Sequence, residues 1–134
     1  MIHADTSFLV DLLRDATRGI RGPATVLLEE IAREQIRVGV HVVCELVAGA
    51  EGSQRPTVER QRVRRLCGGL VVSYPDERFA PAYARLLTSL RGGGRPIATM
   101  DLLIATAAIV DDAVLVTRNT KHFSRVPGLE IRGY

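Results

Sequence analysis

The sequence predicts a single α/β domain over residues 1–134, with a central parallel β-sheet of about four to five strands flanked by helices. Three observations support this prediction. The chain has 134 residues, of which 46% are hydrophobic and 25% charged, as expected for one globular domain with its own core. Short apolar segments of strand length alternate along it with segments of helical periodicity. No internal repeat or linker-like stretch divides it.

The first elements are indicated by apolar runs and by residues that begin helices. Ile2–Ala4 is short and has a strand-like composition. Asp5, Thr6 and Ser7 follow it, and these residue types are common at helix starts. We therefore expect a strand followed directly by a helix over residues 8–13.

The rest of the chain continues the alternation. Pro23 is a typical first helical residue, and a helix through about Glu34 precedes an alternating strand over residues 36–40. Gly52 and the pair Gly68–Gly69 mark the ends of the next two helices. These two helices are expected over residues 42–50 and 55–66, and two more over residues 76–90 and 101–110. The remaining strands are expected over residues 70–72 and 114–116, with a last one at 129–131.

Charge and cysteine usage exclude several classes of protein. The chain carries 18 Lys and Arg against 15 Asp and Glu, and a net charge of +3 is too small for a general polyanion binder. Its 2 cysteines cannot form a tetrahedral zinc site alone. The longest near-apolar run is shorter than the ~20 residues that span a bilayer, and no secretory signal is visible. We therefore expect a cytoplasmic protein without a membrane partner.

Parallel α/β sheets bind ligands beyond the carboxyl ends of their strands, so the polar residues there are the candidate site. Asp5 follows the first strand, and Asn119 and His122 follow the strand at 114–116. Asp101 begins a helix that is apolar on every side, so its start should lie near the interior. Each residue also has an ordinary explanation. Asp5 and Asp101 can cap helices, Asn119 can form a turn, and His122 can lie on the surface.

Glu45 is harder to place from the pattern alone. It belongs to the expected helix over residues 42–50, whose apolar stripe points well away from it, so periodicity favours a solvated surface glutamate. Several acids that converge in one pocket would instead need a cation to offset their repulsion. Oxygen ligands of this kind suit Mg²⁺ or Mn²⁺, which can promote displacement at phosphorus.

Four segments of the chain, in order, carry a resemblance that covers nearly its whole length. They are Ile2–Leu13, Val43–Ala50, Asp101–Ala107 and Leu115–Phe123. In these segments the chain resembles PIN-domain proteins and, within that family, VapC-type toxin ribonucleases. The resemblance implies that Asp5, Glu45 and Asp101 are catalytic acids that hold Mg²⁺, for which Mn²⁺ can substitute. It also implies cleavage of RNA, inhibition by a cognate antitoxin, and a homodimer.

One position departs from the family pattern. Many relatives carry an acid immediately before the final Phe of the last segment, where this chain has His122. We therefore expect a single well-held metal ion. Asn119 is expected to take part in catalysis, and Thr6, Thr117 and His122 are expected to position the acids or a water molecule.

Two other functions stay open at this point. The chain could be a non-catalytic PIN-fold module that binds RNA or an antitoxin, with His122 marking a lost active site. It could also be a phosphoacceptor receiver domain, although such a domain needs a second acid beside Asp5, where this chain has Thr6.

Overall fold

The computed structural model describes residues 1–134 and contains one five-stranded sheet in the order β3-β2-β1-β4-β5. All neighbouring strands run parallel. The strands are β1 (Ile2–Ala4), β2 (Ile36–Gly39), β3 (Val71–Ser73), β4 (Val114–Val116) and β5 (Ile131–Arg132). The helices are α1 (Thr6–Arg18), α2 (Pro23–Glu30), α3 (Val40–Glu51), α4 (Pro56–Cys67), α5 (Phe79–Gly92), α6 (Thr99–Val110) and α7 (Thr120–Phe123). The predicted parallel α/β class is confirmed.

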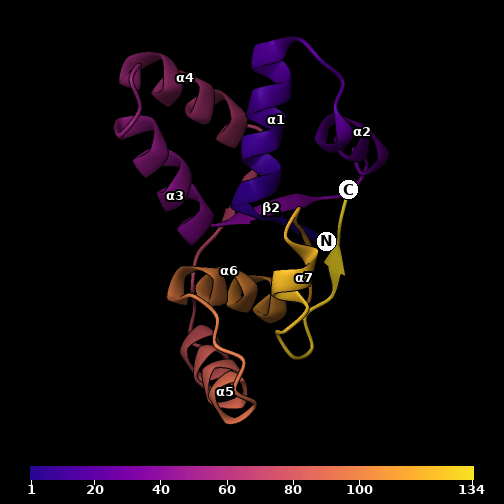
Figure 1. Ribbon diagram of the computed structural model, residues 1–134, viewed down its shortest axis with the longest axis vertical. Coiled ribbons are helices and arrows are strands. Elements are labelled where there is room, and N and C mark those ends of the chain that lie inside the picture. The colour runs from indigo at the N-terminus through magenta and orange to yellow at the C-terminus, as the bar shows by residue number, and fades with distance from the viewer.

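The strand order reverses between β1 and β4. The chain runs from β1 outward through β2 to β3, and then returns across the sheet to β4 and β5. Helices α1 to α4 lie on one side of the sheet, and α5 and α6 lie on the other (Figure 1). The register pairs Ala4 with Val116, so Asp5 and Thr117 leave their strands side by side. A ligand is expected at this carboxyl edge, where the strand order reverses.

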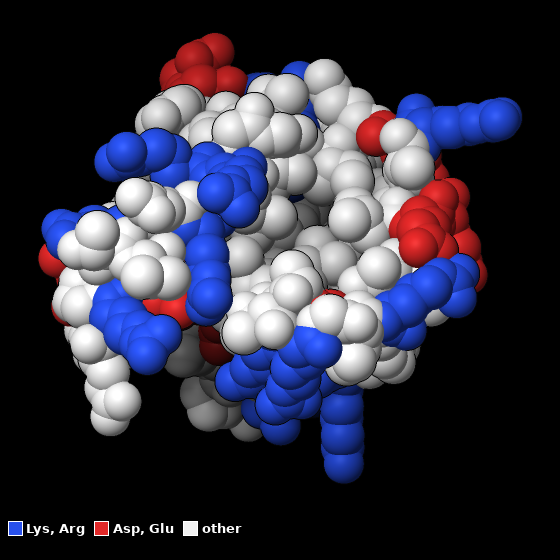
Figure 2. All heavy atoms as spheres, turned by 90° about the horizontal axis from the view of Figure 1, so that it is seen from above, with Lys and Arg blue, Asp and Glu red and all other residues white.

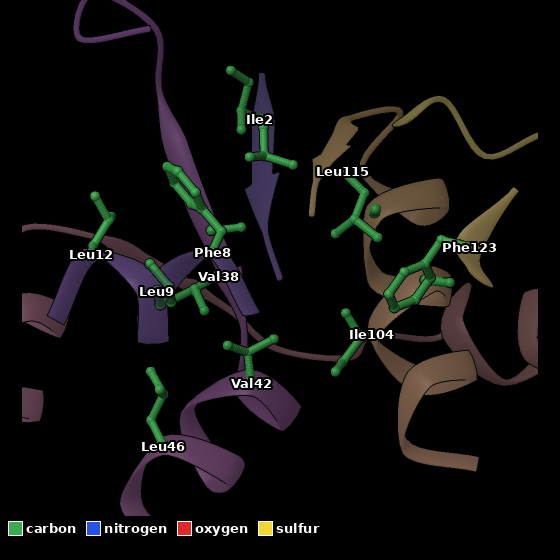
Figure 3. Packing of buried hydrophobic residues seen from close by; sticks show 14 of the residues in the cluster. Ile2, Phe8, Leu9, Leu12, Val38, Val42, Leu46, Ile104, Leu115 and Phe123 are labelled. Atoms are coloured by element: carbon green, nitrogen blue, oxygen red, sulfur yellow. The ribbon is translucent and has the colours of Figure 1, made fainter. Parts of the chain in front are cut away.

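The core packs helices against the strands from several directions. Figure 3 shows Leu9 of α1, Val42 of α3, Ile104 of α6 and Phe123 of α7 around the central strands. All four side chains are at most 2% exposed. Because the core draws on nearly every element, the carboxyl edge of the sheet is fixed by the fold as a whole.

Helix α6 is buried over most of its surface, as its apolar sequence predicts. Leu102, Ala105 and Ala108 are fully inaccessible, and the hydroxyl of the equally buried Thr106 donates to the Leu102 carbonyl at 2.7 Å. This local bond satisfies the one polar side chain that α6 buries completely. Neither α6 nor any other helix is long and apolar enough to cross a bilayer.

Helix α1 is longer at both ends than the predicted helix over residues 8–13. Asp15, in its last turns, is buried and accepts hydrogen bonds from the Thr25 backbone N–H at 3.3 Å and the Thr25 hydroxyl at 2.7 Å. Its carboxylate thus caps the N-terminus of α2, which has no side-chain cap of its own. Gly22 permits this approach, because a Cβ there would lie 2.6 Å from the Asp15 carboxylate.

Other boundaries differ for local reasons. Helix α5 begins at Phe79 rather than at residue 76, because the Asp76 side chain accepts the Arg78 backbone N–H at 2.9 Å in a turn that precedes the helix. Helix α2 ends at Glu30, earlier than predicted. The sequence did not predict α7, because a helix of four residues is too short to show a periodic pattern.

One buried polar cluster joins α6 to the sheet. His3 of β1 is 1% exposed, and its Nε2 lies 2.7 Å from Oδ2 of Asp111, which follows α6. The Ser73 hydroxyl donates to the same oxygen at 2.8 Å. Burial lowers the pKa of His3 below its ordinary 6.5, although Asp111 opposes this effect. Burial tends to raise the pKa of Asp111, but hydrogen bonds from His3 and Ser73 outweigh it, so that this pKa is also lowered.

Candidate active site

Asp5 is the buried centre of the carboxyl edge. Its backbone N–H donates to the Val116 carbonyl at 2.9 Å, and the residue is only 3% exposed. Oδ2 accepts hydrogen bonds from Ser7 Oγ at 2.8 Å and from Thr117 Oγ1 at 2.7 Å. Asp5 is the N-cap residue of α1, but its side chain makes no capping hydrogen bond. The carboxylate is therefore oriented by two hydroxyls, which leave Oδ1 free of hydrogen bonds from the protein.

Glu45 approaches the site from α3. Thr6, the first residue of α1, donates from Oγ1 to Glu45 Oε1 at 2.6 Å. Both residues are half-buried. Periodicity was right to place Glu45 off the core face, but its explanation as a purely solvated glutamate is wrong. Glu45 faces the start of α1, next in sequence to Asp5.

Asp101 lies in the first turn of α6 and contacts α7; it shares no hydrogen bond with Asp5 or Glu45. Its Oδ2 lies 3.0 Å from Nε2 of His122 in α7, and the two side chains are 32% and 34% exposed. The side chain does not cap α6. A carboxylate in the first turn is nevertheless favoured by the positive end of the helix dipole. His122 therefore contacts one of the three predicted acids directly.

The loop after β4 carries the remaining predicted residues. Thr117 is fully buried, and its hydroxyl accepts the Asn119 backbone N–H at 3.0 Å while it donates to Asp5. The Asn119 side chain is exposed and bonds to none of the acids. Thr117 is thus built into the site, whereas the Asn119 amide is free to meet a bound molecule.

The three acids share one pattern that bears on metal binding. Asp5, Glu45 and Asp101 each accept protein hydrogen bonds on one oxygen only. The other oxygen of each carboxylate receives none. One oxygen is thus used for orientation, and the second is available to a hard cation, for which carboxylate oxygens are the preferred ligands.

The same acids do not form a closed metal cage. No group of three or more His, Cys, Asp or Glu side chains in the structure is arranged to hold a metal ion together. The structure instead joins the acids to partners pairwise: Asp5 to Ser7 and Thr117, Glu45 to Thr6, and Asp101 to His122. The donor types and the free oxygens fit Mg²⁺, and a bound ion would have to draw the three carboxylates together.

Sequence reasoning missed the role of Ser7. It was assigned only to helix initiation, yet it is 8% exposed, donates to Asp5, and accepts the Arg118 backbone N–H at 3.1 Å. Its position two residues after Asp5, at the start of a helix, was the one available signal.

Two grooves lie beside α1. Figure 2 shows a hollowed, largely uncharged centre on the face seen from above, bordered by Lys and Arg and, at one side, by Asp and Glu. A groove of about 440 Å³ between α1, α3 and α4 includes Thr6 and Glu45 and therefore reaches the acidic site. A second groove of about 600 Å³ lies between α1, α2 and α4, with Leu13, Ile20 and Leu28 among its lining residues.

Comparison with known proteins identifies the family to which this fold belongs. A family model described as PIN domain matches residues 2–129, and the chain belongs to that family. The chain is similar to Ribonuclease VapC19 of Mycobacterium tuberculosis (strain CDC 1551 / Oshkosh), with 34% identity over 94% of each chain. It is also similar to Ribonuclease VapC1 of Haemophilus influenzae (strain R2866), with 30% identity over 94% of this chain and 92% of the relative.

A solved structure agrees in fold. The chain is similar to one in the crystal structure of VapBC2 from Rickettsia felis bound to a DNA fragment from their promoter. The TM-score is 0.91 at 27% identity, and the match covers 100% of this chain and 99% of the other. The resemblance stated from the four sequence segments is confirmed.

Proposed function

We propose that this protein is a Mg²⁺-dependent endoribonuclease that hydrolyses RNA phosphodiester bonds, with Mn²⁺ able to substitute. One observation carries the proposal: three acids at the carboxyl edge each present one oxygen that the protein leaves free. The similarity to proteins named ribonucleases, over nearly the full length, supports the choice of RNA as substrate.

In this proposal Asp5, Glu45 and Asp101 hold the metal ion. When bound there, Mg²⁺ would supply positive charge beside the phosphate and would activate a water molecule for attack. The protein supplies orientation: Ser7 and Thr117 fix Asp5, and Thr6 fixes Glu45.

The residues after β4 complete the proposed site. His122 holds Asp101 in place. The exposed Asn119 amide is the catalytic group proposed to contact the RNA or an attacking water. It is not committed to any bond within the site.

We further propose that the protein is the toxin of a toxin–antitoxin pair and acts as a homodimer in the cytoplasm. The similar chain from Rickettsia felis was solved as part of a VapBC complex, which supports an antitoxin partner. The groove of about 600 Å³ beside α1, with its apolar lining, offers a surface that a partner segment could cover.

A second candidate function is a PIN-fold module that binds RNA or antitoxin without cleavage. The contact between His122 and Asp101 favours it, because the imidazole occupies one of the two Asp101 oxygens that a cation would use. The two candidates predict different results in the same experiment.

The test is cleavage of total bacterial RNA by the purified protein with Mg²⁺, with Mn²⁺ and with excess EDTA. We expect metal-dependent cleavage by the wild type and none by Asp5→Asn or Asp101→Asn. Asp76→Asn is the matched control, because this exposed carboxylate pairs with Arg78 away from the site. Cleavage that persists in Asp5→Asn would refute the proposed site. RNA binding without cleavage in the wild type would favour the non-catalytic module.

A further inference from the structure

Asp11 joins three parts of the chain close to the proposed active site. It lies on α1, less than two turns after Asp5. Its Oδ2 accepts the Tyr134 hydroxyl at 2.6 Å, and its Oδ1 accepts Arg118 Nη1 at 2.7 Å. The Asp11 side chain is 17% exposed and the Arg118 side chain 50%, so solvent screens this ion pair from the arginine side and the two hydrogen bonds fix the geometry.

The Arg118 end of this network leads back to Asp5. The Arg118 backbone N–H donates to Ser7 Oγ at 3.1 Å, and Ser7 Oγ donates to Asp5 Oδ2 at 2.8 Å. Thr117, the preceding residue, donates to the same Asp5 oxygen at 2.7 Å. The short segment 117–118 is therefore held from two sides. Ser7 binds the Arg118 backbone N–H, and Asp11 binds the Arg118 guanidinium group.

Tyr134 fixes the Asp11 carboxylate from the other side. Its ring packs edge-on against Phe8, with ring centres 5.3 Å apart at 61°, and Phe8 is fully buried. Burial and the hydrogen bond to Asp11 both raise the pKa of the Tyr134 hydroxyl. The hydroxyl consequently stays protonated near neutral pH and remains a donor to Asp11.

We propose that Asp11 and Tyr134 are positioning residues for Asp5, which act through the segment Thr117–Arg118. The effect on catalysis rests on the proposed nuclease function, whereas the mechanical link does not. Asp15 provides an internal contrast. It lies on the same helix and is buried, but its hydrogen bonds go to Thr25 of α2 and not to the loop beside Asp5.

The first test compares Tyr134→Phe, Asp11→Asn and Asp15→Asn in steady-state cleavage of an RNA oligonucleotide that carries a site mapped in total RNA. Tyr134→Phe keeps the ring packed on Phe8 and removes only the hydroxyl. Because a misplacement of about 1 Å can cost about 100-fold in rate, we expect kcat to fall by about 10-fold in Tyr134→Phe and by more in Asp11→Asn. KM should change by less than about twofold. Asp15→Asn should lower the unfolding temperature and leave kcat unchanged.

The second test measures the link without cleavage. Amide hydrogen exchange of Arg118, followed by NMR, should be faster in Tyr134→Phe and Asp11→Asn than in the wild type or Asp15→Asn. Unchanged kcat together with unchanged Arg118 exchange in Tyr134→Phe, which keeps the packing, would overturn the proposal. If the wild type cleaves no RNA, the proposed function fails separately. Faster Arg118 exchange would then still support the positioning link, and unchanged exchange would refute it.

Discussion

Replacement of Thr117 by valine should show how much activity depends on the orientation of Asp5, because the Asp5 carboxylate itself is kept. Thr117 is fully buried, and valine has nearly its shape but lacks the hydroxyl. The substitution removes the 2.7 Å hydrogen bond to Asp5 Oδ2 and the acceptor of the Asn119 N–H. It keeps Ser7 as the second donor to Asp5. Asp5 is therefore expected to lose one of its two hydrogen-bond donors, and the loss affects only Oδ2.

The magnitude follows from the charge of the acceptor. A hydrogen bond to a charged group contributes about 1.5–3 kcal/mol. If this energy holds Asp5 in its reactive orientation, kcat should fall by about 10- to 100-fold, at about 1.4 kcal/mol for each factor of ten. Stability should fall less, by about 1–2 kcal/mol, because Asn119 is exposed and water can satisfy its N–H. For a domain of this size, that loss lowers the unfolding temperature by roughly 4–8 °C.

The assay pairs thermal unfolding with cleavage kinetics for Thr117→Val and Thr117→Ser. Serine restores a hydroxyl at the same position, so Thr117→Ser should recover most of the kcat lost in Thr117→Val. KM should stay within about twofold in both variants, since Thr117 is buried and does not face a bound RNA. If Thr117→Val cleaves RNA like the wild type, Asp5 does not depend on this hydroxyl, and the proposed site geometry is wrong.

Three further predictions concern stability and partner binding. Leu102→Ala should destabilise the protein by about 2–5 kcal/mol in urea unfolding, because the side chain is fully buried in α6 and leaves a cavity; a loss below about 1 kcal/mol would contradict this packing. Stability should fall as the pH drops below 6.5, because the folded protein binds the His3 proton more weakly than the unfolded chain does. The lowered pKa of Asp111 has the same sign at lower pH, and His3→Gln should flatten unfolding midpoints measured between pH 7.5 and 5.5. Ile20→Glu, at a half-exposed position in the groove beside α1, should weaken capture of a co-expressed antitoxin without loss of fold by circular dichroism; unchanged capture would move the partner surface elsewhere.

The sheet could be predicted because its central strands are covered on both sides. Residues of β1 are all buried, as are Leu115 and Val116 of β4, so these strands appear in the sequence as short apolar runs between helices. Helix lengths were less predictable, because they depend on contacts that are distant in the sequence. The extension of α1 is stabilised by the Asp15 carboxylate at the start of α2, which a local pattern does not reveal.

In the candidate site, too, local sequence patterns indicated some residues, whereas contacts between distant residues could not be predicted. Asp5 and Asp101 stood out as candidates because each lies at or near the start of an expected helix, and Asp5 also follows a strand. Glu45 could not be found from periodicity, which places it off the core face without saying what it faces. The deciding contact is with Thr6, 39 residues away in the sequence. The bond between Thr117 and Asp5 spans 112 residues, so it becomes visible only through the register of β1 and β4.

These long separations make the site a product of the completed fold. The donors come from several elements: Asp5 is oriented by Ser7 of α1 and by the loop after β4, Glu45 by α1, and Asp101 by α7. Asp5 belongs to the first residues of the chain, but its donor Thr117 takes its place only when β4 pairs with β1. A partly folded chain in which β4 is unpaired therefore keeps Ser7 beside Asp5 but lacks the Thr117 hydroxyl. Because the Thr117 donor reaches Asp5 only when β4 pairs with β1, the proposed metal binding and cleavage should weaken when that pairing is lost, even where the other acids keep their partners.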